Sequence, residues 1–338
     1  MSLWSEVRCS SWCWGLVFVV ACARGDADDT AVAPDARRTM RDVSWETDWT
    51  VGGDESDTLL AYPLQLVADR ERVYVVDPGF SRVLALHTRD GTVAWTFGTP
   101  GSGPREFATP RAIALDAAGN LLVSDQKNMR VTVVDTAGRW VRDIPVHSVS
   151  GLHSMCPLHD GTLLVMSYDP ERPVIRVSPN GEVLGRGTLP WQQLAKAPLR
   201  FQQGIFAPTV DRRSCIFALQ ANSGLAQYNG TGFDTPTPYV EDHPLVHAAD
   251  YRHGERNAYR SAVSVTADSA TVVVGFRGST RNAGRLLDVY DATTRQYSSS
   301  MLLPKAIIWM TRVDDTYYVI TGRNRLPVIA ALRPSGAP

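Results

Sequence analysis

Short hydrophobic segments that alternate with polar residues occur throughout the chain. Between residues 112 and 144 there are four of them, at 112–115, 121–124, 131–134 and 140–144. The residues between these segments are rich in Gly, Asn and Asp, which favour tight turns. Alternating β-branched residues on either side of such turns are typical of antiparallel hairpins. The pattern therefore predicts a four-stranded antiparallel sheet in this part of the chain.

The same arrangement recurs about every 48 residues. Pro63 and Pro110 begin two equivalent units, and Asp77 and Asp125 end the second strand of the same two units. Weaker copies of the second strand end near residues 167, 220, 276 and 321. Sequential four-stranded units without crossover helices exclude an α/β fold and are typical of a radial repeat. We therefore predict an all-β fold, a six-bladed β-propeller of four-stranded antiparallel blades.

The six expected blades cover residues of about 57–98, 103–146, 150–189, 203–241, 258–303 and 305–335. The last of these units supplies only three strands, whereas residues 43–52 form an alternating strand without a unit of its own. We expect this N-terminal strand to complete the sixth blade as its outermost strand and so to close the ring. The propeller domain would then span residues 43–338.

An apolar stretch at residues 12–21 precedes the repeats. As a helix it would cover about 15 Å, half of a bilayer, so a signal peptide over 1–21 is expected rather than a membrane span. The stretch ends in Val-Val-Ala before Cys22, which resembles a bacterial lipobox and predicts lipid attachment at Cys22. An ordinary secretory signal is the alternative. Residues 22–42 are small, polar and acidic, and they predict a flexible tether.

These features predict an exported protein that is held to a membrane of the cell envelope by its lipid and faces the periplasm or the exterior. Lys and Arg total 34 against 35 Asp and Glu, a net charge of −1, so no basic field exists to hold nucleic-acid phosphates. We expect no nucleic-acid partner. Cys156 and Cys215 would remain after export, which permits a disulfide, but they lie in different expected blades, so two buried free thiols are the expectation and a disulfide is the alternative.

The second repeat also carries a family resemblance. Residues 101–110, Gly-Ser-Gly-Pro-Arg-Glu-Phe-Ala-Thr-Pro, resemble the opening of an NHL repeat, and residues 116–131 match the rest of that motif. The likeness is strongest in the second blade and fair in the first, and from residue 150 onward only the strand rhythm persists. The whole chain is similar to the exported six-bladed propeller lipoproteins of bacteria, most of which have no assigned activity.

Loop lengths predict which face of the propeller binds a ligand. If the strands of a blade are called a to d from the inside outward, the a–b and c–d turns are short, whereas the b–c and d–a connections are long. Binding residues concentrate in long loops, so the face with the b–c and d–a loops is the expected binding face. Its candidate residues are Trp191, which we expect to face solvent, and His153, His243, His247, His253 and Arg277.

Two Asp–Arg pairs recur at matching points of the first two blades, Asp77 with Arg82 and Asp125 with Arg130. An aspartate and an arginine on either side of a b–c loop can form a bidentate pair that holds the loop. Because the pair repeats by blade, we predict a structural role for it rather than ligand binding.

The histidines raise the question of a metal. The NHL resemblance implies a comparison with a peptide-amidating lyase, which holds its metal with histidines from the central funnel. His153, His243 and His247 are the candidates here, but no predicted helix aligns them, and we predict no cofactor, with a divalent metal as the alternative. The Glu, Asn and Asp set of calcium-binding lactonase-type propellers has no counterpart on the mainly aliphatic inner strands.

Nucleophile motifs are absent from the sequence: there is no G-x-S-x-G, H-E-x-x-H or P-loop pattern. We therefore expect a binding or scaffolding module for a protein, peptide or glycan ligand. The alternative is a metal-dependent lyase or hydrolase, similar to lactonases or to the peptide-amidating lyase, with its site at the mouth of the central channel.

Overall fold

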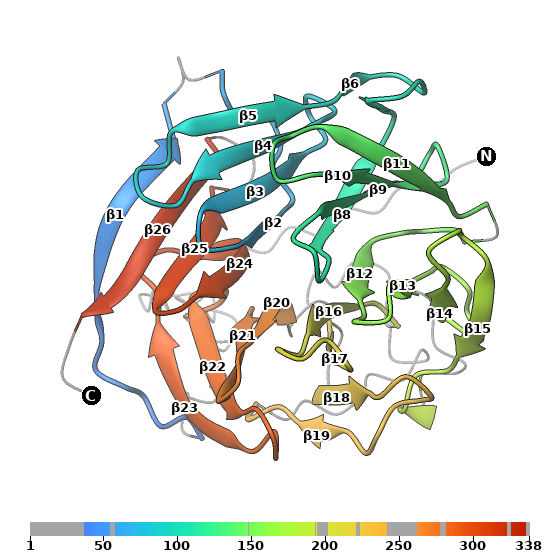
Figure 1. The fold of residues 1–338 in the computed structure, drawn as a ribbon. Helices are drawn as coiled ribbons and strands as arrows, with labels where there is room; N and C mark the ends of the chain where they lie inside the picture. The colour runs from blue at the N-terminus through green and yellow to red at the C-terminus, as the bar shows by residue number, and fades with distance from the viewer. Residues whose placement is uncertain are drawn as a thin grey trace, which may run out of the picture. The chain divides into compact units, whose positions relative to one another are not determined.

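Six four-stranded antiparallel sheets follow one another along the chain (Figure 1). The computed structural model describes residues 37–54, 58–147, 149–192, 194, 202–220, 224–241, 262–277, 282–322 and 326–335. No helix in these ranges is long and apolar enough to cross a membrane. The expected signal peptide, residues 1–21, and Cys22 lie outside the described residues.

The strands of blades one to three are β2 (Gln65–Ala68), β3 (Arg72–Asp77), β4 (Arg82–His87), β5 (Val93–Phe97); β8 (Pro110–Leu115), β9 (Leu121–Asp125), β10 (Arg130–Val134), β11 (Trp140–Pro145); β12 (Ser154–Pro157), β13 (Leu163–Met166), β14 (Val174–Val177) and β15 (Val183–Gly187). Those of blades four to six are β16 (Gly204–Pro208), β17 (Cys215–Leu219), β18 (Gly224–Tyr228), β19 (Thr237–Pro238); β20 (Ala262–Ala267), β21 (Thr271–Phe276), β22 (Leu286–Asp291), β23 (Tyr297–Leu302); β24 (Ile307–Val313), β25 (Thr316–Thr321), β26 (Val328–Ser335) and β1 (Ser44–Gly52).

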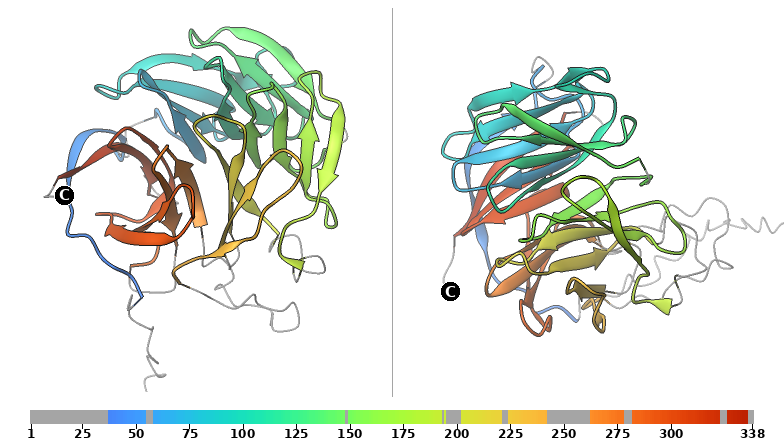
Figure 2. Two further views of the ribbon diagram at one scale, coloured as in Figure 1. Left: turned by 60° about the horizontal axis from the view of Figure 1, so that its bottom comes forward. Right: turned by 45° about the vertical axis from the view of Figure 1, so that its right-hand side comes forward.

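The inner strands of the six sheets form a closed ring. Each of β2, β8, β12, β16, β20 and β24 contacts the inner strand of the next blade, and β24 contacts β2. The sheets fan outward from this ring, so that the outer strands lie at the periphery (Figures 1 and 2). The predicted six-bladed β-propeller is thereby confirmed, and its inner strands surround a central channel.

The N-terminal strand closes the ring as expected. β1 pairs with β26 in antiparallel register, from Ser44 opposite Ser335 to Gly52 opposite Val328, as the outermost strand of blade six. Two tryptophans of β1 bind the strand to the neighbouring blades five and one. Trp45 Nε1 donates to the Leu302 carbonyl of blade five (2.8 Å), and Trp49 Nε1 donates to the Thr88 carbonyl of blade one (2.7 Å). A strand that the repeats left over thus ties the two ends of the propeller together.

The part of the expected tether that the structure describes is bound to blade five. Met40 forms a parallel bridge with Ser300, and the main chain at Arg41 and Thr39 exchanges hydrogen bonds with that residue (2.8 and 2.9 Å). The Arg38 side chain is buried and forms ion pairs with Asp288 and Glu241. The chain therefore joins the propeller several residues before residue 43, where we expected the tether to end.

Neighbouring sheets pack through aliphatic and aromatic side chains. Between blades three and four the buried set includes Leu164, Phe206 and Phe217. Cys156 of β12 and Cys215 of β17 form a disulfide across this same contact. The sequence left the pairing of these two cysteines open, and the structure shows that they are bonded between adjacent blades.

The NHL-like segment forms a tight approach to blade two. β6 (Thr99–Pro100) and β7 (Glu106–Phe107) pair in parallel, and the Glu106 carboxylate accepts a hydrogen bond from the Gly103 N–H (2.7 Å). Gly101 adopts a φ of 151°, and a Cβ there would lie 2.1 Å from a Glu106 carboxylate oxygen. Only glycine fits this position, which explains the first glycine of the motif.

Candidate functional site

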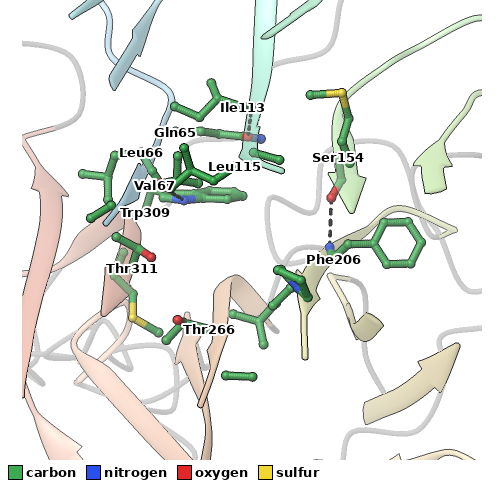
Figure 3. Close-up of a pocket in the computed structure, with 18 of the residues that line it drawn as sticks. Gln65, Leu66, Val67, Ile113, Leu115, Ser154, Phe206, Thr266, Trp309 and Thr311 are labelled. Carbon is green, nitrogen blue, oxygen red and sulfur yellow. Dashed lines mark hydrogen bonds between the residues drawn. The ribbon is translucent and has the colours of Figure 1, made fainter. Parts of the chain in front are cut away.

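The central channel has a cavity at each end. The cavity at the end of the short turns has a volume of about 180 Å³ and is lined by residues of all six inner strands (Figure 3). Its walls are mainly aliphatic, and its two cations have partners. Arg212 donates to the Leu115 carbonyl across the channel, and Arg312 pairs with Asp268. The polar groups at this end therefore stabilise the ring itself.

The opposite cavity opens on the face of the long loops. It has a volume of about 330 Å³. Its polar lining comes from the starts of inner strands and the ends of second strands: Gln65, Arg111, His153, Gln203, Gln220 and Arg277. We call this cavity the loop-face mouth.

Blade geometry explains why these residues converge. Gln65 and Arg111 lie at the start of β2 and β8, and His153 and Gln203 immediately precede β12 and β16, so each lies where an inner strand enters the channel. Gln220 and Arg277 follow β17 and β21, the second strands of blades four and five. In an antiparallel blade the innermost strand begins at the same face where the second strand ends. Both sets of residues therefore meet at one mouth.

Gln65 spans the mouth between three blades. Its Nε2 donates to the main-chain carbonyl of His153 (3.0 Å), and its Oε1 accepts a hydrogen bond from the Ile113 N–H (3.3 Å). Trp309 lines the channel next to it and is fixed by a hydrogen bond from its Nε1 to the Leu66 carbonyl (2.9 Å). These contacts tie blades one, two, three and six together at the mouth.

His153 is the most unusual group in the loop-face mouth. Its Nδ1 lies 2.8 Å from the Gly151 carbonyl, and its ring stacks on Tyr168 at 5.4 Å. A carbonyl only accepts hydrogen bonds, so Nδ1 carries the proton and Nε2 is a bare acceptor. Nε2 is buried and has no hydrogen-bond partner among the described residues. Burial lowers the pKa of His153 to about 4, and the nearby charge of Arg111 acts in the same direction, so the ring is neutral at physiological pH.

Several other polar groups of the mouth are also unused within the described part of the chain. The half-buried Arg111 makes no hydrogen bond or ion pair there, and the side-chain amides of Gln203 and Gln220 make no hydrogen bond there. Arg277 adds a second positive charge. No Asp or Glu occurs among the described residues that line the cavity. The described lining therefore carries two arginines and no carboxylate, and it is rich in hydrogen-bonding groups.

A divalent metal does not fit the described residues of this mouth. Zinc takes three or four convergent His, Cys or carboxylate ligands, and within the described ranges no group of three such side chains gathers at any point. The one imidazole of the mouth stands beside two arginines, which repel a cation. His243 and His247, the other metal candidates, lie outside the described residues.

The structure brings together two of the predicted binding residues, His153 and Arg277, on the expected face. The expectation for Trp191 is wrong. We expected it to face solvent, but it is buried between blades three and four, where its ring lies 6.1 Å from that of Phe217. His243, His247 and His253 lie outside the described residues, so their role stays a prediction.

The two Asp–Arg pairs act differently from expectation. Asp77 accepts hydrogen bonds from the N–H groups of Ala61 and Tyr62 (both 2.8 Å), in the segment that leads into blade one. Asp125 does the same for Thr109 before blade two (2.8 Å). The arginines donate to main-chain carbonyls of the segments that lead into the same two blades. Arg82 donates to the Leu59 carbonyl, and Arg130 donates to the carbonyls of Gly103 and Glu106. The expected bidentate pairing is wrong for Asp125, whose nearest approach to Arg130 is a single contact of 3.9 Å.

The sequence matches no protein-family model. It is 35% identical to the human NHL repeat-containing protein 3 over 78 residues, which are 22% of this chain and 22% of that protein. The chain thus matches only about a fifth of its curated relative's length. The NHL resemblance is confirmed over a segment of that size.

Solved structures with the same architecture are much less similar in sequence. A Bacteroides fragilis protein named as an exported protein superimposes with a TM-score of 0.58 at 11% identity, covering 91% of this chain and 98% of the other. The virginiamycin B lyase of Staphylococcus aureus superimposes with a TM-score of 0.51 at 10% identity, covering 86% and 99%. At such identities the likeness shows the propeller fold alone.

Proposed function

We propose that this protein is an exported binding module of the cell envelope, anchored through Cys22, that recognises a protein, peptide or glycan ligand at the loop-face mouth. The observation that carries the proposal is the group of unused polar atoms there: the Arg111 guanidinium, Nε2 of His153 and the amides of Gln203 and Gln220. A concave site with a few convergent polar groups on a rigid scaffold is the usual form of a ligand site.

Export has independent support. Disulfides such as Cys156–Cys215 persist in oxidising compartments and are rare in the cytosol of most organisms. The sequence before Cys22 resembles a lipobox. The Bacteroides fragilis neighbour is also named as an exported protein.

A binding panel tests the function. The purified full chain is applied to immobilised envelope glycans and peptides, together with the variant Arg111→Gln/Arg277→Gln. Arg89→Gln is the matched control, because this exposed arginine lies in the c–d turn of blade one, on the opposite face. We expect at least one bound ligand to be lost by the mouth variant and kept by the control. A panel without binding, or with binding that the mouth variant retains, would refute the proposal.

A labelling experiment tests the anchor. Cells that express the chain are fed a tagged fatty acid, and the lipid label on the protein is compared with that on Cys22→Ser. The label should be lost in the variant. If the variant is labelled as strongly as the original chain, the lipobox interpretation fails while the proposed binding site stands.

The second candidate is a lyase or hydrolase that works in the same mouth. It is favoured by the neutral His153, whose bare Nε2 has the form of a general base, and by a structural neighbour that is named as a lyase. However, a pKa of about 4 makes His153 a weak base at neutral pH, where efficient bases titrate near the working pH. Mass spectrometry of the bound ligand separates the two functions: a binding module returns it intact, and an enzyme returns fragments.

A further inference from the structure

We propose that the ligand of the loop-face mouth is an acidic sugar, a uronate that is either free or at the end of a glycan. This inference rests on the proposed binding function and narrows its ligand to one chemical class. It follows from three requirements that the mouth imposes together: a negative charge, a hydrogen-bond donor close to that charge, and several groups that both donate and accept.

The negative charge is required by Arg111. Other arginines of the channel are neutralised or bonded: Arg312 pairs with Asp268, and Arg212 donates to the Leu115 carbonyl. Arg111 is half-buried yet has no such partner among the described residues, and no carboxylate occurs in the described lining around it. A guanidinium in this setting matches a planar carboxylate, which it can bind with two parallel hydrogen bonds.

The donor is required by His153. This side chain is only 9% exposed, and its Nε2 is an acceptor without a partner. A buried acceptor that stays unsatisfied is costly, and native proteins rarely leave one. A simple carboxylate has no proton to donate, whereas a sugar acid carries hydroxyl groups beside its carboxylate. One of them can donate to Nε2 while the carboxylate binds Arg111.

Gln203 and Gln220 require ligand groups that both donate and accept hydrogen bonds. Each side-chain amide offers two N–H groups and a carbonyl, and a hydroxyl group likewise donates and accepts. A peptide C-terminus can also offer a carboxylate with N–H and C=O groups, whereas a uronate presents its carboxylate and several hydroxyl groups on one compact ring. The cavity of about 330 Å³ lies at the small end of ligand pockets, and Trp309 gives it an apolar wall for the carbon face of a ring.

Calorimetric titration of the purified full chain tests the inference. The probes are galacturonate and glucuronate, their neutral parents galactose and glucose, and an N-acetylated dialanine with a free carboxylate. We expect at least one uronate to bind about 10-fold or more tightly than its neutral parent, because the parent lacks the charge-assisted hydrogen bonds to Arg111.

Variants assign the contacts. Arg111→Gln should weaken uronate binding about 10- to 100-fold, the factor expected for a hydrogen bond between charged groups, and should leave the weak binding of the neutral parent unchanged. His153→Asn keeps a donor for the Gly151 carbonyl but removes the acceptor nitrogen, so it should weaken uronate binding about 2- to 10-fold. Arg89→Gln removes the same charge from the opposite face and should have no effect.

Three results would overturn the inference. They are equal affinity for a uronate and its neutral parent, uronate binding that Arg111→Gln does not change, and no uronate binding at millimolar concentration. If the dipeptide binds more tightly than either uronate and Arg111→Gln abolishes that binding, the ligand is a peptide: the acidic-sugar inference then fails, while the loop-face mouth stands as the binding site.

Discussion

Replacing Arg38 with alanine should destabilise the propeller far more than removing an exposed arginine. The Arg38 side chain is only 2% exposed, although it lies in a polar N-terminal segment. Its Nε and Nη2 donate to the two carboxylate oxygens of Asp288 (2.9 and 2.8 Å), and its Nη1 donates to Glu241 (2.7 Å). The guanidinium also lies 5.1 Å from the centre of the Phe276 ring.

The size of the effect follows from what the substitution leaves behind. The Asp288 side chain is completely buried, and without Arg38 it would retain the hydroxyl of Ser300 as its hydrogen-bond donor nearby (2.6 Å). Removing one member of a buried ion pair typically costs about 3–5 kcal/mol, because the other charge stays desolvated. Burial opposes the charge on Arg38, but the hydrogen bonds and charges of Asp288 and Glu241 outweigh it and raise the pKa of Arg38. The arginine is therefore charged at every pH at which the fold is studied.

Urea unfolding followed by tryptophan fluorescence measures the change. Arg38→Ala should lower the free energy of unfolding by about 3–5 kcal/mol. The control is Arg333→Ala, which breaks an ion pair with Asp48 at a side chain that is 54% exposed; water screens such a pair, so its loss should change the unfolding free energy far less than Arg38→Ala does. If the two variants lose the same stability, the N-terminal segment does not anchor to blade five through Arg38, and the reasoning is wrong.

Three further predictions concern the propeller. Replacing Cys156 and Cys215 with alanine should lower the free energy of unfolding by up to about 4 kcal/mol, which is the loop-closure value for a sequence separation of 59 residues. A reductant should shift the urea midpoint of the original chain but not that of the double variant, and a shift in the double variant would contradict this. Burial lowers the pKa of His153 to about 4, whereas the pKa of an unfolded histidine is about 6.5. Between these two pH values the unfolded chain binds the proton more readily than the folded chain, so the contribution of His153 should make the free energy of unfolding rise with pH. An NMR titration midpoint of His153 near its ordinary value would contradict the burial argument. Trp49→Ala removes a buried indole and its hydrogen bond to blade one, which should lower the free energy of unfolding by about 3–5 kcal/mol. The variant should be cleaved by a protease first in β1, and cleavage at the same rate as in the original chain would contradict this.

The fold was predictable from the sequence because the information that defines it is local. Alternating residues fix the strands, and Asp, Asn and Gly fix the turns: Asp116, for example, accepts hydrogen bonds from the N–H groups of Ala118 and Asn120. The closure also followed from counting, since a unit of three strands and one spare strand permit few arrangements. These features required no knowledge of contacts between distant residues.

The attachment of the N-terminal segment was not predictable for the opposite reason. Arg38 lies in a stretch whose composition is that of a tether, and its partners are 203 and 250 residues away in the sequence. Nothing near Arg38 distinguishes it from a solvated arginine. Contacts over such separations become visible only once the ring is closed.

The candidate site was predictable in part. Loop lengths indicated the face on which this polar cavity opens, together with His153 and Arg277, but they missed Arg111, Gln203 and Gln220. A signal for these residues exists. Arg111, His153 and Gln203 occupy the position at the start of the inner strand where blades one and six carry the aliphatic residues Leu64 and Ile308.

Trp191 shows the limit of interpreting loops by residue type. It lies outside the strands in a long connection, which suggested an exposed aromatic contact. In the structure it lies in the buried cluster between blades three and four, together with Leu189 and Leu194 of the same connection. Whether a large side chain in a loop is exposed depends on the packing of two neighbouring blades, which the repeat pattern does not describe.

A crystal structure of the full chain with galacturonate would show whether the loop-face mouth binds an acidic sugar. We expect one sugar in the loop-face mouth, with its carboxylate within hydrogen-bond distance of Arg111 and one of its hydroxyl groups donating to Nε2 of His153. A sugar bound at the opposite end of the channel or on the outer surface, with no contact to Arg111 or His153, would contradict it.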